Sequence, residues 1–500
     1  NRRVSRTDEG NTYLMSESLS YAGEFILEKV EIIAAGDDRV DLTKATLQID
    51  IWEDIEEATL SGSIVFTDNF GLVNSMPIIG QETLRLKIRT PSINAGGTFG
   101  EEQIIDRIFY VNAVGGGQNI KPNVSVVTLE FVSMELVRNN RTIVDRILTG
   151  TYSDIAKQML TSDLKTKKTV FVEKSSGVKK IVANELTPIE ILDQCTREAV
   201  SAENGQPTYK MFETLTGFHF RSVQSMYATE SAQRYTVIEN ETSERGVPNV
   251  LAEYARIKDY TVDRSPDTMT GTMDGQFSSE VTIHDIFNKD IIVQKFNYFD
   301  QFEPDAENFT INKYHKKGAK AMYSKTALDQ EGNNLGSAST KKFLSSISLK
   351  DQALGTDASL TTGDGKYAFQ APNPDKWLQT RQAFNKSLAG GFIIDLVAFG
   401  HTHMRAGQVV DINIPRQARN KQEKDDPLDR FYRGPFLIAA CHHKFAVDGE
   451  NGPTHNIFLQ CVKDCVDEEL EFVETLPQDI DDTFFEADPV VEEFYQDEIT

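Results

Sequence analysis

Two histidines separated by one residue, His401 and His403, have the types and spacing best suited to chemistry in this 500-residue sequence. Alternate residues of an extended strand share a face, so both imidazoles could bind one metal ion. Neighbouring strands could supply His442, His443 or His455 as further ligands. No carboxylate or cysteine stands beside the pair at a recognised ligand spacing, so the pattern favours structural histidines. A metal-dependent hydrolase that uses His401 and His403 remains the alternative.

The four cysteines provide weaker candidates. Cys461 and Cys465 would share a face if VKDCVDEEL formed a helical turn, but a zinc site needs two more ligands. Cys441 and His442 are neighbours on an expected strand and would point to opposite faces, which argues against a nucleophile–base pair. Motifs of the GxSxG, HExxH, P-loop and GxGxxG types do not occur. We therefore expect no enzyme activity and no catalytic, cofactor-binding or metal-binding residues.

Length and charge restrict the class of protein. Five hundred residues indicate roughly three or four domains. The net charge of −24 disfavours binding of nucleic acid through basic patches, and no apolar run is long enough to span a membrane. The opening NRRVSRTDEG lacks the apolar stretch of a secretory signal, and four cysteines are too few for a disulfide scaffold. These features predict a soluble, multidomain, intracellular protein.

The last residues are strongly acidic. From Asp464 to Thr500 there are fifteen acidic residues and no Lys or Arg, interspersed with aromatic residues such as Phe484 and Phe494. Such a composition does not fold by itself. A solvated tail is one interpretation, and a strap that docks on a partner or sister subunit is the other.

Period-2 patterning dominates the first part of the sequence. In TLQIDIWED, Leu47, Ile49 and Ile51 alternate with polar residues, as in a half-buried strand. The runs SGSIVFTD, TLRLKIRTP, IIDRIFYVNAV and VVTLEFVSME follow, separated by Gly, Asn and Pro. This pattern predicts an antiparallel sandwich or barrel.

A helix-containing segment comes next. In TPIEILDQCTREAVSA, Thr187 is an expected N-cap, Pro188 stands at the first helical position and Glu190 completes a capping box. We expect Ile189, Leu192, Cys195 and Ala199 along its inner face. With the helix SDIAKQMLTSDL, the strand KKIVAN and the hairpin TYKMFET–LTG–FHFRSV, the segment predicts a small α+β domain.

Strands return after this segment. The run GQFSSEVTIHDIFNKDIIVQKFNYFDQF predicts a hairpin that turns near Asn288, and the polar residues 301–375 predict a long loop. A helix around WLQTRQAFNKSLAG then precedes FIIDLVAFG, GQVVDINIP, GPFLIAACHHKF and THNIFLQCVKD.

The two strand-rich ends repeat one order. GQETLRLKIRTP, IFYVNAV and VVTLEFVS correspond to GQVVDINIP, FLIAACHH and NIFLQCVK, each series running GQ, strand, Pro, loop, strand, Gly loop, strand. Gene duplication would produce two similar barrels. The fold class we predict is mainly β, with two tube-like antiparallel β-barrel or sandwich domains and a small α+β domain.

Four segments in this order resemble the central baseplate hub protein family of contractile-tailed bacteriophages. The run LQIDIWEDIEEATLSGSIVFTDNFGLVNSMPIIGQETLRLKIRTP resembles its first tube-like domain, and TPIEILDQCTREAVSAENGQPTYKMFETLTGFHFRSV is similar to its interposed α+β domain. GQFSSEVTIHDIFNKDIIVQKFNYFDQFE, with AFGHTHMRAGQVVDINIP and GPFLIAACHHKF, resembles its second tube-like domain. Spike proteins of type-six secretion share this architecture. The division that we expect is an N-terminal arm 1–19, a first tube-like domain 20–138, an α+β domain 139–235, a second tube-like domain 236–300 and 376–466, a polar insert 301–375 and an acidic tail 467–500.

The resemblance implies a homotrimer in which two tube-like domains per subunit form a ring of six. Such a ring joins the sixfold tail tube to a trimeric spike and surrounds the channel through which DNA leaves. It implies a virion protein of the tail baseplate, assembled in the host cytoplasm, with the tube protein, the central spike and the wedge and tape-measure proteins as partners. The sequence has no spike repeat or lysozyme-like module, so we expect the spike to be a separate chain.

Overall fold

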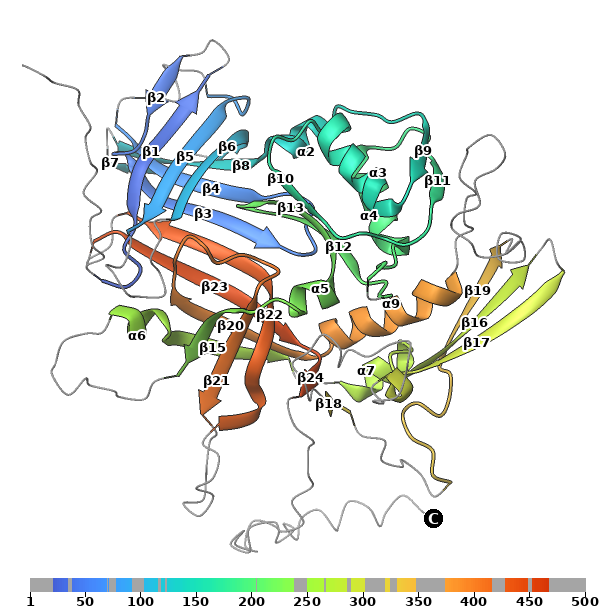
Figure 1. Cartoon of the computed structure of the whole chain (residues 1–500). Helices are drawn as coiled ribbons and strands as arrows, with labels where there is room; N and C mark the ends of the chain where they lie inside the picture. The colour runs from blue at the N-terminus through green and yellow to red at the C-terminus, as the bar shows by residue number, and fades with distance from the viewer. Residues whose placement is uncertain are drawn as a thin grey trace, which may run out of the picture. The chain divides into compact units, whose positions relative to one another are not determined.

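The computed structural model is mainly β, which confirms the predicted fold class (Figure 1). It describes residues 21–34, 38–69, 71, 78–91, 103–115, 118–121, 124–203, 205–237, 250–264, 267–285, 289–301, 320–323, 331–347, 374–415, 428–447 and 452–466. The expected N-terminal arm, the acidic tail 467–500 and Asn288 lie outside these residues.

A 14-stranded sheet dominates the described residues, and its N-terminal half is called the first module here. The strands of the first module pair in the order β3-β4-β8-β6-β5-β1, every pair antiparallel. A short β2 (Arg39–Asp41) follows β1, and β7 (Gln118–Lys121) pairs with β8. The six main strands are β1 (Ile26–Ile33), β3 (Thr46–Asp54), β4 (Ser61–Asp68), β5 (Thr83–Thr90), β6 (Gln103–Val114) and β8 (Val124–Ser133).

The second module continues the same sheet in the order β15-β20-β23-β22-β21-β14. All its pairs are antiparallel except β14 with β21, which is parallel. A short helix, α6 (Val250–Tyr254), precedes β15. Its strands are β14 (Ser231–Thr236), β15 (Ile257–Arg264), β20 (Phe392–Phe399), β21 (Val409–Pro415), β22 (Leu428–Ala446) and β23 (Thr454–Lys463).

The two modules have the same strand order. In chain order, β3, β4, β5, β6 and β8 correspond to β15, β20, β21, β22 and β23, and each takes the same place in its half of the sheet. The pairing of β6 with β8 is interrupted at Asn112, and that of β22 with β23 at Ala439, by a one-residue bulge. Gly80 and Gly407, the glycines of the two GQ pairs, both have positive φ, 88° and 80°. The strand order predicted to repeat in the sequence is therefore confirmed.

A small α+β part lies between the modules in the sequence. As predicted, Thr187 and Glu190 form a capping box at the start of α4 and Pro188 is its first residue. The predicted inner face is confirmed at Leu192, Cys195 and Ala199, which are fully buried. Ile189 is only partly buried against the same cluster, and Ile191, which was not predicted, is fully buried. The predicted hairpin is β12 with β13. Its elements are α2 (Met134–Asn139), β9 (Ile147–Gly150), α3 (Tyr152–Gln158), a π-helical turn (Met159–Asp163), β10 (Thr169–Val172), β11 (Lys179–Val182), α4 (Pro188–Glu198), β12 (Tyr209–Thr214), β13 (Gly217–Ser222) and α5 (Val223–Tyr227).

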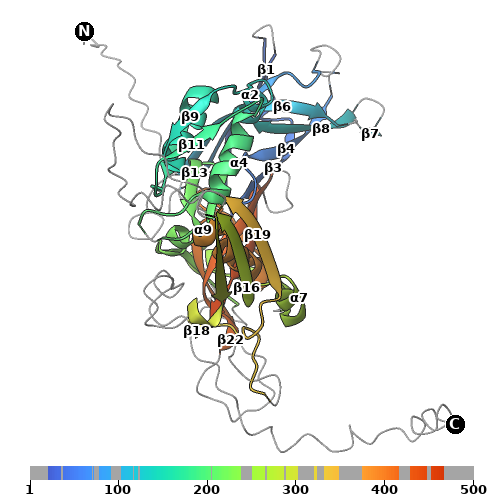
Figure 2. The ribbon, with the colours of Figure 1, turned by 90° about the vertical axis from the view of Figure 1, so that its right-hand side faces the viewer.

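The connection between β15 and β20 carries a separate three-stranded sheet. The predicted hairpin is present as β16 (Ser278–Asp285) and β17 (Asp290–Asn297), but it lies outside the large sheet. Its partner is β19 (Lys341–Ile347), parallel to β16, so the expected loop over 301–375 is wrong at this segment. The apolar side chains of Phe343 and Val281 explain the strand, since they pack with Leu378 of α9 (Pro374–Ala389). Figure 2 shows α9 together with β16 and β19. Short elements complete this connection: α7 (Thr268–Met273), a 3₁₀ turn (Phe299–Gln301) and β18 (Lys320–Ala321), which pairs with β24 (Cys465–Val466).

Candidate functional site: the junction of the two modules

The two modules are joined by main-chain hydrogen bonding between β3 and β22. These strands pair antiparallel from Gln48 opposite Ala446 to Asp54 opposite Ala440. The long β22 makes this possible, because its first half pairs with β21 and its second half with β3, while β23 follows its other edge. The blue and orange-red strands of Figure 1 therefore belong to one continuous sheet.

Side chains cross the junction in both directions. Ile55, which follows β3, is buried in the hydrophobic cluster of the second module. Phe445 of β22 is buried in the cluster of the first module, where its ring contacts Phe25 edge-on at 5.1 Å between centroids. Neither module thus completes its core alone, which makes the junction a fixed rather than a hinged connection.

An aromatic row follows the solvent-facing side of the junction. Trp52, His442 and Phe458 lie opposite one another on β3, β22 and β23, and their rings stack with centroids 5.0 and 5.2 Å apart. Asp50 accepts a hydrogen bond from His442 Nε2 at 2.8 Å. Trp52 and Phe458 nonetheless remain 41% and 37% exposed. The row stabilises the strand pairing by cross-strand contacts.

The tip of the β12–β13 hairpin is inserted where the modules meet. Leu215 is buried in the cluster of the first module, and its main-chain N–H donates to Glu53 Oε1 at 2.7 Å. Its carbonyl accepts hydrogen bonds from the guanidinium of Arg107, Nε at 2.9 Å. The other oxygen of Glu53 accepts from the N–H of Ala406 at 2.9 Å, and Arg405 Nε lies 3.8 Å from the carboxylate. One buried carboxylate therefore contacts all three parts of the chain.

Burial controls the charge of this carboxylate. Removal from water raises the pKa of Glu53 to about 7, against the opposing effect of Arg405 and the two N–H donors. The same burial lowers the pKa of Arg405. Glu53 is therefore poised to exchange a proton near neutral pH.

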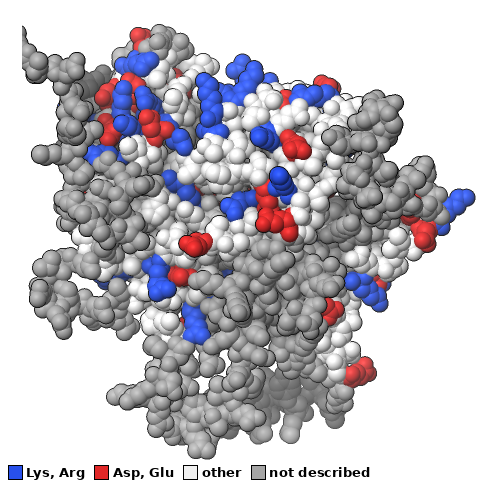
Figure 3. All heavy atoms as spheres, in the orientation of Figure 1, with Lys and Arg blue, Asp and Glu red and all other residues white. Residues whose placement is uncertain are grey.

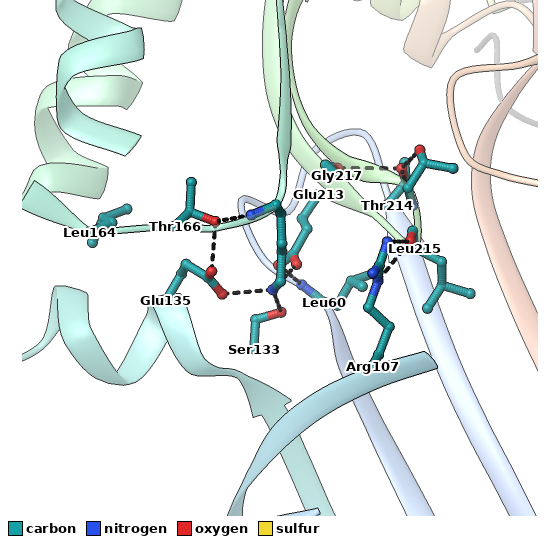
Figure 4. A network of polar contacts seen from close by, with 12 residues as sticks. Leu60, Arg107, Ser133, Glu135, Leu164, Thr166, Glu213, Thr214, Leu215 and Gly217 are labelled. Carbon is teal, nitrogen blue, oxygen red and sulfur yellow. Dashed lines mark hydrogen bonds and ion pairs between the residues drawn. The ribbon is translucent and has the colours of Figure 1, made fainter. Parts of the chain in front are cut away.

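A second buried ionic group lies beside the hairpin (Figure 4). Lys168 contacts the carboxylates of Glu135, at 2.6 Å, and Glu213, and it donates to Ser133 Oγ at 3.3 Å. Glu213 also accepts from the N–H of Leu60 at 3.1 Å, which links the hairpin to the first module. Burial raises the pKa of Glu213, whereas Lys168 holds the pKa of Glu135 below its usual range although burial opposes it. Each buried charge of Lys168, Glu135 and Glu213 therefore has an ionic partner in direct contact.

His401 and His403 do not lie in a strand, which the alternative of a shared metal site required. They follow β20 in a turn, where their rings stack with centroids 3.5 Å apart. His443 and His455 lie nearby, with Nδ1 of His443 3.1 Å from Nε2 of His455. Burial lowers the pKa of all four histidines, to about 4 for His403 and about 3 for His455. Over the described ranges no group of three or more His, Cys, Asp or Glu residues is arranged to hold a metal ion.

The cysteine candidates are separated by the fold. Cys441 is buried, whereas adjacent His442 faces outward, as strand geometry predicted. The sulfur of Cys441 lies 3.4 Å from Nε2 of His443 instead. Burial raises the pKa of the Cys441 thiol well above its usual range. Cys461 lies in β23 and Cys465 in β24, so the helical turn considered for them is wrong. All four native cysteines are buried, and none of them forms a disulfide.

Charges on the described surface are mixed in sign. Figure 3 shows blue and red atoms together over β1 and β5. There Lys87 and Arg89 both contact Glu28, at 2.5 and 2.8 Å, and Arg85 contacts Asp106 at 2.9 Å. Each of these charges thus has a partner of opposite sign, as expected of an ordinary solvated face.

The residues that join the parts were not identified from the sequence. Glu53 gave one usable signal, since it continues the inward alternation of Ile49 and Ile51 and therefore places a carboxylate on the buried face of β3. Lys168 and Glu213 gave none, because their meeting depends on the tertiary packing of the hairpin.

Comparison with known proteins finds structures but no sequence family. No family model and no curated protein matches the sequence. Solved structures of phage tail proteins and of type VI secretion components are similar to the chain. One is the tail protein from Neisseria meningitidis MC58, 12% identical, with 87% of this chain and 96% of that chain covered and a TM-score of 0.46. Another is the 43 kDa tail protein of prophage MuSo2 from Shewanella oneidensis, at 11% identity, 88% and 100% coverage and a TM-score of 0.44.

A third similar structure is an Escherichia coli type VI secretion component, described as structurally similar to bacteriophage T4 tail proteins. It is 10% identical, with 84% of this chain and 73% of that chain covered and a TM-score of 0.36. All three TM-scores lie below 0.5, so these similarities do not establish a function. The helices of the described residues include none that is long and apolar enough to span a membrane.

Proposed function

We propose that the chain is a structural baseplate hub of a contractile phage tail. Three copies form a ring that joins the sixfold tail tube to the threefold central spike and surrounds the channel through which DNA leaves. The observation that carries this proposal is the presence of two modules with the same strand order in one continuous sheet. Three chains then supply six equivalent modules, which a sixfold partner requires.

The modules differ in a way that suits an adaptor. In the first module, residues Ile55–Leu60 connect β3 to β4. The equivalent connection in the second module runs from residue 265 to 391 and carries the small sheet and α9. In a ring of six similar modules, the large sheet repeats six times. The small sheet and α9 occur on every second module and therefore repeat three times.

The sequence resemblance to the hub family supplies the partners. They are the tail tube protein, the central spike protein and the wedge and tape-measure proteins, in a virion baseplate assembled in the host cytoplasm. The chain acts without enzyme activity, and DNA passes without sequence-specific contacts. The proposed domain division is that of the sequence analysis, with the small sheet as an insert in the second tube-like domain. A hub of another contractile injection system is the alternative within the same architecture.

Measurement of mass in solution tests this function. Size-exclusion chromatography with multi-angle light scattering should give three times the chain mass of 56.1 kDa. Negative-stain images of that species should show a ring with a central opening. A monomer at micromolar concentration would contradict the proposal, whereas a dimer would contradict the symmetry.

A further inference from the structure

The two strands that correspond to β3 and β22 in the other module of each do not pair with each other within the chain. By strand order β15 is the equivalent of β3, and β6 is the equivalent of β22. The strand β7 continues β6 along β8, as the second half of β22 continues along β23: Gly115 N donates to Thr128 O at 2.7 Å, and Gln118 then lies opposite Val126. β6 and β7 together thus match the full length of β22.

Both counterparts present an open edge. Among the described strands β15 pairs with β20 alone and β7 with β8 alone, whereas β3 and β22 pair on both sides. They cannot meet within the arrangement of one chain, because β20, β23, β22, β3, β4 and β8 lie between them in the sheet. An open strand edge exposes main-chain donors and acceptors and favours the addition of another strand.

We infer that β15 of one copy of the chain pairs antiparallel with β7 and the end of β6 of a second copy, and so repeats the β3–β22 ladder between chains. This inference rests on the proposed ring. The occupant of each edge is a second copy because the chain already contains the matching pair, in which each edge has its natural partner. Such pairing leaves neither edge open once three chains close the ring.

The repeat also fixes the register. Alignment on the bulges and on the shared partner strands makes Thr261 the equivalent of Asp50, and Gln118 the equivalent of Lys444. Asp50 lies directly opposite Lys444 within the chain. Thr261 of one copy therefore lies opposite Gln118 of the next, with Tyr260 opposite Asn119 as the adjacent pair.

Paired cysteines test this register. The variant Gln118→Cys with Thr261→Cys should form a disulfide between chains under mild oxidation, because directly opposite strand residues bring their Cβ atoms within about 5.5 Å. A closed ring gives a covalent trimer on a non-reducing gel. The native cysteines are all buried, which limits background linkage.

The chain offers its own matched control. Asp50→Cys with Lys444→Cys occupies the equivalent pair and should link within one chain, so its migration stays that of a monomer. Oxidation conditions are set so that this control links completely. The single variants Gln118→Cys and Thr261→Cys should give no trimer.

The outcomes separate the inference from the proposed function. A covalent trimer from the paired variant supports both. Absence of interchain linkage in a protein that light scattering shows to be a trimer overturns the register and the strand pairing but leaves the ring. Linkage within one chain, or dimers from a single cysteine, also overturns the pairing, and a monomer by light scattering overturns the proposed function itself.

Discussion

The carboxylate of Glu53 accepts a hydrogen bond from the main-chain N–H of Leu215 at 2.7 Å, although 162 residues separate the two. The same carboxylate accepts from Ala406 in the second module. A β-strand of the first module, the hairpin tip of the α+β part and the turn before β21 thus share one buried acceptor. This explains how the hydrophobic clusters of the two modules and of the α+β part are held in contact.

Removal of this acceptor should destabilise the whole junction. Glu53→Ala leaves two buried N–H groups and the Arg405 guanidinium without their partner, which should lower the free energy of unfolding by about 3–5 kcal/mol. Glu53→Gln keeps an acceptor oxygen and should lose less. Urea denaturation of both variants measures the difference, and equal stability of Glu53→Ala and wild type would contradict the role of Glu53.

Acid should destabilise the second module through its buried histidines. The pKa of His455 is lowered to about 3 from an ordinary 6.5, so its contribution to stability is present above pH 6.5 and is lost as the pH falls toward 3. At pH 5 the loss due to His455 amounts to about 2 kcal/mol of unfolding free energy. Unfolding free energies measured between pH 7.5 and 5 should fall, and His455→Gln should fall less steeply.

Glu53 acts in the opposite direction and provides the control. Its folded pKa of about 7 lies above the ordinary value of 4.5, so its contribution is present at low pH and is lost as the pH rises through 7. Glu53→Gln should therefore steepen the loss of stability on acidification. Stability that rises in wild type from pH 7 to pH 5 would show that Glu53 outweighs the histidines.

Much of the β architecture could be predicted from the sequence, because strand alternation and turn residues are local signals. The alternation of Ile49 and Ile51 marked β3 correctly, and the capping box at Thr187 marked the start of α4. β19 was missed because its run KKFLSSI stands in a polar segment, and its strand conformation depends on pairing with β16. The ion group at Lys168 was missed for the same kind of reason, since its partners come from α2 and β12.

That ion group should show strong energetic coupling. Lys168→Met leaves Glu135 and Glu213 buried without their cation and should lower the free energy of unfolding by about 3–5 kcal/mol. Addition of Glu213→Gln should recover part of the loss, because only one buried carboxylate, that of Glu135, then lacks its cation. A double-mutant cycle measures this, with exposed Lys157→Met as the control for loss of one lysine. Additive effects would contradict the coupling.

The turn of the β12–β13 hairpin should tolerate no side chain at Gly217. This glycine lies opposite Thr169 in the parallel pairing of β13 with β10, and a Cβ atom there would stand 2.1 Å from the carbonyl oxygen of Thr169. Gly217→Ala must therefore displace either β10 or the hairpin tip, and we expect a loss of about 3 kcal/mol from overpacking and backbone strain together. Gly205→Ala separates the two causes, because Gly205 also has a positive φ, 73°, but no atom within 4 Å of its added Cβ. That control should lose only the strain, about 1 kcal/mol. Since the same tip carries Leu215 into the first module, Gly217→Ala should also expose the junction to limited proteolysis. An equal loss of unfolding free energy in Gly217→Ala and Gly205→Ala would show that the close approach to Thr169 does not fix the hairpin.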